Sequence, residues 1–143
     1  MKKLMILAVL AVLAAATALP ATATADKVHN VVSIHADQYF CCTDQIYGSV
    51  ESGKPKCEPN RTIKLFHNPA SEEGKRRGDS FQHVGTTTTN SKGEYSFEGV
   101  FQTKTLTSDF PQGRYFARAT RARRGNDVCT RDDSRVIEIN DFN

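Results

Sequence analysis

A run of arginines is the densest group of side chains in this chain that could support chemistry. Arg118, Arg121, Arg123 and Arg124 lie close together in the sequence, and the aromatic residue Phe116 precedes them. Guanidinium groups beside an aromatic ring could bind an acidic ligand, a polysaccharide or a membrane surface. The same residues could instead be the solvated outer face of a strand, where charge protects a sheet edge from aggregation. Both interpretations place the run at the protein surface.

A second candidate interaction site is the tetrapeptide Arg77-Gly78-Asp79-Ser80, which falls in an expected polar loop. Cell-adhesion integrins recognise Arg-Gly-Asp by meeting the arginine with an acidic pocket and the aspartate with a metal ion. Gly-Asp is also ordinary turn chemistry, so the tetrapeptide predicts a loop whether or not a partner binds there. Arg77 and Asp79, together with the arginine run, form the candidate interaction surface.

The sequence favours a protein without catalytic activity. The four histidines, His29, His35, His67 and His83, are scattered over separate segments. The chain contains no nucleophile elbow, phosphate loop, dinucleotide fingerprint or zinc-protease motif. His35 and Asp37 share a strand face but supply only half of a metal site. We therefore expect no catalytic residue, no metal and no cofactor. The alternative is an exported hydrolase of unrecognised type that relies on His67 or His83.

Four cysteines, an even number, predict disulfide bonds in an exported chain. Cys41 and Cys42 would point to opposite faces of a strand, which disfavours a bond between them. Cys57 and Cys129 each precede an expected strand, and the two strand starts could lie side by side. Cys57–Cys129 is therefore the preferred bridge. Cys41 and Cys42 would then form a strained vicinal bond, stay free or bond between chains.

The first 25 residues are typical of a secretory signal peptide. Two lysines precede an apolar stretch, and Ala23-Thr24-Ala25 is a small-residue cleavage site before Asp26, with cleavage before Thr24 as the alternative. We expect a secreted protein without a membrane span, in which residues 26–143 form one domain. Two of the 19 basic residues leave with the leader and all 16 acidic residues remain. The near-neutral remainder of 17 against 16 removes the compositional argument for a nucleic-acid partner.

Alternating apolar and polar residues predict about seven short strands separated by turn signals. Within Arg61–His67, for example, Ile63 and Leu65 are expected to face inward. The segment Thr86–Phe101 reads as one hairpin, with Tyr95 and Phe97 on one face. The expected strands are Val31–His35, Gln45–Ser52, Arg61–His67, Ser80–Thr89, Glu94–Glu98, Gly113–Arg123 and Ser134–Asn140.

Loops are expected between these strands, at Asn68–Asp79 and Arg124–Asp133, and the lone Gly85 suggests a bulge. No segment shows a sustained helical period, and proline and glycine are spread throughout. The pattern therefore favours an all-β, antiparallel, two-sheet sandwich with Greek-key connections, of the immunoglobulin-like kind. Functional residues would most readily lie on the loops Asn68–Asp79 and Arg121–Asp133.

The order of three motifs along residues 45–140 carries a family resemblance. They are G-x-V followed by Gly-Lys-Pro at 48–55, T-x-x-x-G-x-Y-x-F at 89–97 and G-x-Y at 113–115. This order resembles the transthyretin-like (prealbumin-like) sandwich and the carboxypeptidase regulatory-like domains, in their small exported, disulfide-containing form. The resemblance implies a fold; members of the group bind hormones, carbohydrates or proteins, so it selects no function. The hydroxyisourate hydrolases of this group are similar in ending with Tyr-Arg-Gly-Ser, which Ile139–Asn143 does not match.

These patterns together predict a secreted, non-catalytic binding or interaction module with a polysaccharide or extracellular protein partner at the cell surface. A structural or adhesive protein of the cell envelope is a further alternative. The patterns favour no particular oligomeric state. Asn60-Arg61-Thr62 is an N-glycosylation sequon, which would be used only in a host that glycosylates secreted proteins.

Overall fold

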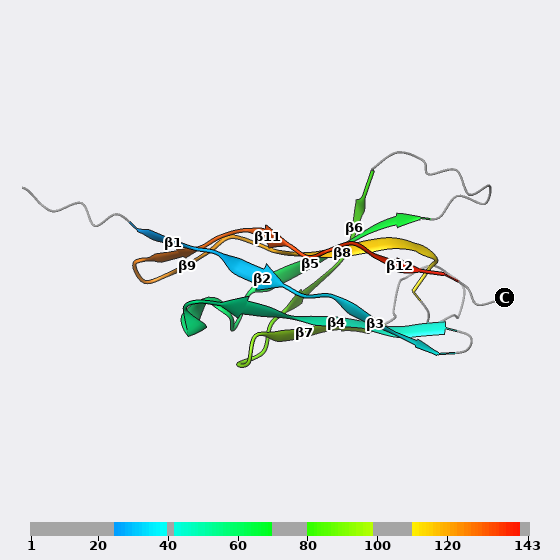
Figure 1. Ribbon diagram of the computed structural model, residues 1–143, viewed down its shortest axis with the longest axis horizontal. Coiled ribbons are helices and arrows are strands. Elements are labelled where there is room, and N and C mark those ends of the chain that lie inside the picture. The colour runs from blue at the N-terminus through cyan, green and yellow to red at the C-terminus, as the bar shows by residue number, and fades with distance from the viewer. Residues whose placement is uncertain (1–24, 40–41, 70–79, 99–109, 141–143) are drawn as a thin grey trace, which may run out of the picture.

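Two facing layers of strands form the computed structural model, which describes residues 25–39, 42–69, 80–98 and 110–140 (Figure 1). Side chains from the two layers meet in a shared core, as in a β-sandwich. The described residues hold twelve strands rather than about seven. Several expected strands are shorter or divided. No helix in these ranges is long and apolar enough to cross a membrane.

The layer drawn uppermost in Figure 1 is an antiparallel sheet that we call the β8 sheet. Its strand order is β11-β8-β5-β6, and β12 pairs with β8 beyond the end of β11. The strands are β5 (Thr62–Pro69), β6 (Gln82–Thr88), β8 (Gly113–Ala119), β11 (Asp132–Asp133) and β12 (Ile137–Ile139).

The facing layer is a second antiparallel sheet, the β4 sheet. The long β4 pairs with β2 and then β3 along one side and with β7 along the other. The strands are β2 (Asn30–Val32), β3 (His35–Tyr39), β4 (Cys42–Ser52) and β7 (Glu94–Glu98). The turn signal at Gly53-Lys54-Pro55 ends β4, as the sequence predicts.

A small third sheet, the β10 sheet, extends one end of the molecule. It has the order β1-β10-β9, with β1 (Asp26–Val28) parallel to β10 (Asp127–Cys129) and β9 (Ala122–Arg124) antiparallel to it. The expectation of a loop over Arg124–Asp133 was therefore wrong. A tight turn at Gly125, with φ of +60°, joins β9 to β10 instead.

The core lies between the β8 and β4 sheets, and strand alternation decides its membership. Ile63 and Leu65 are both 0% exposed, and Tyr95 and Phe97 are buried, all as predicted. A register shift beside Gly85, opposite Leu65 and Phe66, confirms the predicted bulge. The other residues of the main cluster are Val32, Ile34, Ile46, Val50, Phe110, Tyr115, Ala117, Ala119 and Ile139.

The segment Thr86–Phe101 is not a hairpin. β6 pairs with β5 in the β8 sheet, whereas β7 pairs with β4 in the facing sheet. The turn between Asn90 and Gly93, where Gly93 has a φ of +79°, therefore carries the chain from one layer to the other. Local alternation and turn residues are the same for a hairpin and for such a crossing, so the sequence pattern could not distinguish the two.

The predicted disulfide joins Cys57 to Cys129. The reason differs from the expected one, because β12 pairs with β8 and not with β5. Cys57 ends the short 3-10 helix η1 (Pro55–Cys57), and Cys129 ends β10. The bridge therefore fastens the β10 sheet to the connection between β4 and β5. The predictions for Cys41 and for the side chain of Cys42 lie outside the described residues.

Arg61 fills a break in the sheet. The β9–β10 ladder continues the register of the β8–β11 ladder. Between the two ladders, at Thr120 and Thr130, strand pairing is interrupted. The guanidinium of Arg61 donates to the carbonyl oxygens of Thr120 (2.6 Å), Thr130 (2.8 Å) and Cys57 (2.9 Å). The side chain is 0% exposed, and its burial lowers the pKa of Arg61. Three carbonyl dipoles thus hold a buried cation with which no carboxylate of the described residues forms an ion pair.

Candidate functional site

The predicted arginine run is divided among separate faces of the molecule. Arg118 lies on the outer face of β8 and donates two hydrogen bonds to Asp133, at 2.6 and 2.7 Å. Its guanidinium also covers Phe66 and Phe116, at 4.9 and 5.3 Å from the ring centroids. The hydrogen bonds to Asp133 raise the pKa of Arg118. Arg118 therefore belongs to a packed outer-face cluster in which Asp133 already pairs with its charge.

The remaining predicted residues fall in different places. Arg124 donates to the carbonyl oxygens of Pro59 and Asn60, which ties β9 to the turn before β5. Arg121 and Arg123 are exposed, and neither has a side-chain partner among the described residues. Arg77 and Asp79 lie outside the described residues.

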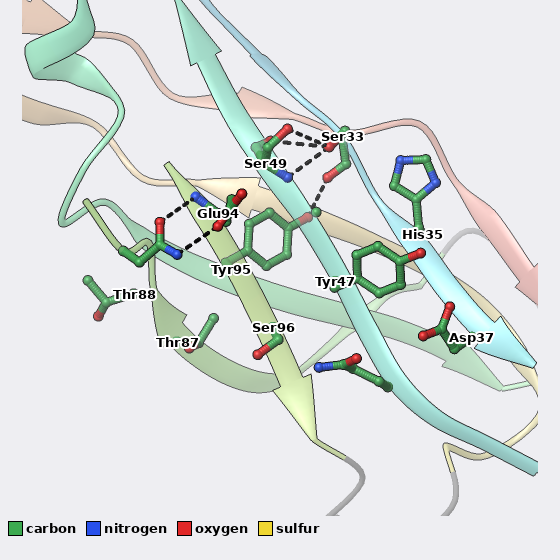
Figure 2. A pocket seen from close by; sticks show the side chains of 13 residues that line it. Ser33, His35, Asp37, Tyr47, Ser49, Thr87, Thr88, Glu94, Tyr95 and Ser96 are labelled. Atoms are coloured by element: carbon green, nitrogen blue, oxygen red, sulfur yellow. Dashed lines mark hydrogen bonds between the residues drawn. The ribbon is translucent and has the colours of Figure 1, made fainter. Parts of the chain in front are cut away.

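A polar groove of about 770 Å³ lies elsewhere, over the outer face of the β4 sheet (Figure 2). Outward-facing side chains of β3, β4 and β7 line it, and its lining continues past the edge of β7 to Thr87 and Thr88 of β6. Side chains alternate along each strand, so the residues between these outward positions, such as Ile46 and Val50, enter the core. The groove is thus a surface formed by the sandwich scaffold, and no residue of the expected functional segment Arg121–Asp133 lines it.

The registers of two ladders build the centre of the groove. They align His35 of β3, Tyr47 of β4 and Ser96 of β7 in one cross-strand row, and Asp37 with Gln45 in the next. The rings of His35 and Tyr47 stack, with centroids 5.6 Å apart and planes inclined by 27°. Tyr47 remains 37% exposed, which is high for a large ring in a sheet. A ring with an accessible surface and polar neighbours suits ligand contact.

Hydrogen bonds fix the floor of the groove. The hydroxyl of Ser33 lies 2.9 Å from that of Ser49 and accepts the backbone N–H of Ser49 at 2.8 Å. The hydroxyl of Tyr95 donates to the carbonyl oxygen of Ser33 at 2.5 Å, and burial raises the pKa of Tyr95. Figure 2 shows these bonds linking Ser49 of β4 and Tyr95 of β7 to Ser33, which lies between β2 and β3. The floor is therefore preorganised across β4.

Hydrogen bonds also fix one rim of the groove, at the turn that contains Asn90. The side-chain amide of Asn90 donates to the carboxylate of Glu94 at 2.9 Å. The side-chain oxygen of Asn90 accepts the backbone N–H groups of Lys92 and Glu94, at 2.8 and 3.0 Å. These bonds hold the turn at the layer crossing in one conformation. The carboxylate of Glu94 stays at the groove edge, where its second oxygen can accept a hydrogen bond.

The other histidines lie apart from the groove. His67 stacks on Tyr115 with centroids 4.4 Å apart, and its Nε2 lies 3.0 Å from the carbonyl oxygen of Gln112. Burial lowers the pKa of His67. The Nε2 of His83 contacts Gly85 and Thr86 of its own strand. The described structure therefore brings neither residue of the alternative hydrolase hypothesis to the groove.

The chemistry of the groove is that of hydrogen bonding and ring stacking. Hydroxyl, amide and carboxylate groups surround the His35–Tyr47 stack. Among the described residues no group of three or more histidine, cysteine, aspartate or glutamate side chains could hold a metal ion. Comparisons with protein-family models, with curated proteins and with solved structures found no match to this chain. What the groove binds must therefore be argued from its own residues.

The groove was not predicted from the sequence, although two of its strands carry a recognisable pattern. Tyr47 and Ser49 in β4, and Glu94 and Ser96 in β7, already alternate with buried residues in the sequence. Two outward-facing polar strands could have been noted as a possible shared surface. Their pairing with each other, and the stacking of His35 on Tyr47, depend on the sheet order, which local patterns do not contain.

Proposed function

We propose that this protein is a secreted, non-catalytic β-sandwich module that binds carbohydrate in the groove of the β4 sheet. The observation that carries the proposal is the stack of His35 and Tyr47 in a cross-strand row with Ser96. The apolar C–H face of a sugar ring can pack against such a ring, and its hydroxyls can bond to the polar side chains around it.

The surrounding groups match the needs of sugar hydroxyls. A hydroxyl both donates and accepts, so carboxylates and amides that converge on an aromatic ring can fix its orientation. Asp37 and Glu94 supply acceptors, and Gln45 supplies a donor and an acceptor. The two carboxylates also make an acidic ligand unfavourable at this position. A neutral or amino-bearing polysaccharide is therefore the favoured class.

Two further features support the wider assignment. The hydroxyl of Tyr115 donates to the carbonyl oxygen of Pro111 at 2.5 Å, four residues upstream. This tyrosine corner is typical of Greek-key sandwiches and supports the proposed prealbumin-like topology. β1 begins at Asp26, the residue after the expected signal cleavage site, so cleavage there would leave every described strand intact. The Cys57–Cys129 bridge fits an exported protein.

A glycan array followed by calorimetric titration of the hits tests the proposal. Tyr47→Ala should weaken binding of the best ligand about tenfold or more, because ring contacts of this kind are worth roughly 1–2 kcal/mol. Tyr47→Phe should retain most of the affinity. Val136→Ala removes a 43% exposed apolar side chain outside the groove lining and should leave binding unchanged.

Two results would overturn the proposal. Failure of the purified protein to bind any neutral or amino-bearing glycan at millimolar concentration would remove the carbohydrate assignment. Chromatography of each bound glycan after long incubation tests the non-catalytic part. Release of shorter products, abolished by His67→Ala or His83→Ala, would favour the hydrolase alternative.

A further inference from the structure

One side of the β10 sheet carries both of its acidic residues together with Arg124, which pairs with Asp127 in the β9–β10 ladder. Its acidic residues, Asp26 and Asp127, are neighbours in the β1–β10 ladder and point to the same side. The ammonium group of Lys54 lies 3.3 Å from Asp26 and 2.8 Å from Asp127, and Lys56 also contacts Asp127. Hydrogen bonds from Lys54 and Lys56 lower the pKa of Asp127, which stays ionised. The acidic side of this sheet is thus neutralised within the fold.

The opposite side of the same sheet carries basic charge. Lys27 of β1 and Arg123 of β9 flank Val128 of β10 in one cross-strand row. The strand spacing of about 4.8 Å puts the bases of the two side chains roughly 10 Å apart. Arg121 lies just before β9, two residues from Arg123. All three basic residues are exposed, and we call them the cationic face.

The cationic face is uncompensated and rigidly supported. None of its three side chains has a hydrogen bond or ion pair with another described residue, in contrast to Arg118 and Arg124. Val128, which lies between Lys27 and Arg123 in their row, is only 5% exposed, and the adjacent Cys129 is held by the disulfide. A surface whose charges project from a fixed sheet loses little backbone entropy when it binds a charged partner.

We propose that the cationic face binds an acidic polysaccharide, independently of the groove on the β4 sheet. Charge complementarity selects an anion, because the face holds three basic side chains and its sheet turns both acids away. Bases that are roughly 10 Å apart suit charges repeated along an extended polymer. A small anion would need donors that converge on one point. A duplex nucleic acid would favour a broader basic surface than this near-neutral chain offers.

Chromatography on immobilised polygalacturonate and on immobilised heparin tests the proposal. The protein is eluted from each column with a salt gradient, and a column of uncharged dextran is the control. The wild-type protein should bind at low salt and elute as salt screens the contacts. The double variant Lys27→Gln/Arg123→Gln should bind about tenfold more weakly, since it loses two exposed ionic contacts. Lys92→Gln/Arg135→Gln removes the same charge from exposed positions outside this face and should bind like the wild type.

Each other outcome counts against the proposal. Equal weakening in both double variants would show an effect of net charge alone. Absence of wild-type retention at low salt on both polymers would remove the site. Tighter binding to duplex DNA or to anionic phospholipid vesicles, lost in the Lys27→Gln/Arg123→Gln variant, would assign the face to a different partner. Tyr47→Ala should leave retention on acidic polymers unchanged, so this site and the groove can fail separately.

Discussion

Gly48 lies directly opposite Tyr95 in the β4–β7 ladder, and the missing side chain of the glycine makes room for the tyrosine hydroxyl. A Cβ atom at position 48 would lie 2.7 Å from that hydroxyl and 2.2 Å from the carbonyl oxygen of Ser33. The two groups are themselves joined by a hydrogen bond. The floor of the groove therefore depends on a glycine in the middle of a strand, where glycine is otherwise unfavourable.

Gly48→Ala should lower the free energy of unfolding by about 2–3 kcal/mol and abolish ligand binding in the groove, because the methyl group collides with backbone. Gly53→Ala is the matched control, since no heavy atom lies within 4 Å of the added Cβ. Urea unfolding of the two variants measures the difference. Equal stabilities would contradict the close contact at position 48.

Arg61→Met should lower the free energy of unfolding by about 3–4 kcal/mol. The substitution keeps a long apolar stem but leaves the carbonyl oxygens of Thr120, Thr130 and Cys57 without the donors that now satisfy them. Arg135→Met, at an exposed position, should change stability by about 0.5 kcal/mol or less. A loss below about 1 kcal/mol for Arg61→Met would mean that the break in the sheet is satisfied in another way.

Removal of the disulfide by Cys57→Ser and Cys129→Ser should cost about 2–4 kcal/mol, because the bridge closes a loop with a sequence separation of 72. The cost of Arg61→Met should be smaller in this background than in the wild type. The two features are coupled, because Arg61 donates to the carbonyl of Cys57 and a loosened turn can then satisfy its carbonyl with water. Additive effects in a double-mutant cycle would refute this coupling.

Acid should destabilise the protein through Asp132. Burial opposes ionisation of its carboxyl group, but hydrogen bonds from Thr130 (2.5 Å) and from Asn30 (3.0 and 3.2 Å) outweigh burial and lower the pKa. A lowered folded-state pKa stabilises the fold above the unfolded value of about 3.9, and that stability is lost as the pH falls through the folded value. Asp132→Asn should therefore flatten the fall in unfolding free energy between about pH 4.5 and 2. An unchanged slope would contradict the role of Asp132.

The direction in which a side chain points was largely predictable from the sequence. Ile63 and Leu65 are buried as expected, and the same alternation in β8 buries Tyr115 and Ala117 and puts Phe116 between them on the outer face. A strand has a period of two residues, so a short window is enough to assign its faces. The even number of cysteines likewise predicted disulfide bonding, although Cys57 and Cys129 are brought together by η1 and β10 and not by adjacent strand starts. The face of a strand residue depends on its neighbours in the sequence, and four cysteines allow only a small number of pairings.

Only the tertiary structure decides which strands pair. Residues 86–98 cross between layers, Tyr47 stacks on His35, and Lys27 lies in a row with Arg123 from the other end of the chain. Each relationship depends on sheet order and register, which together minimise the exposed apolar surface of the whole molecule. The sequence of a single strand does not contain this information. The sequence by itself determined that this protein would be built of amphipathic strands closed by a disulfide. The packing of those strands decided where a groove and a cationic face would form.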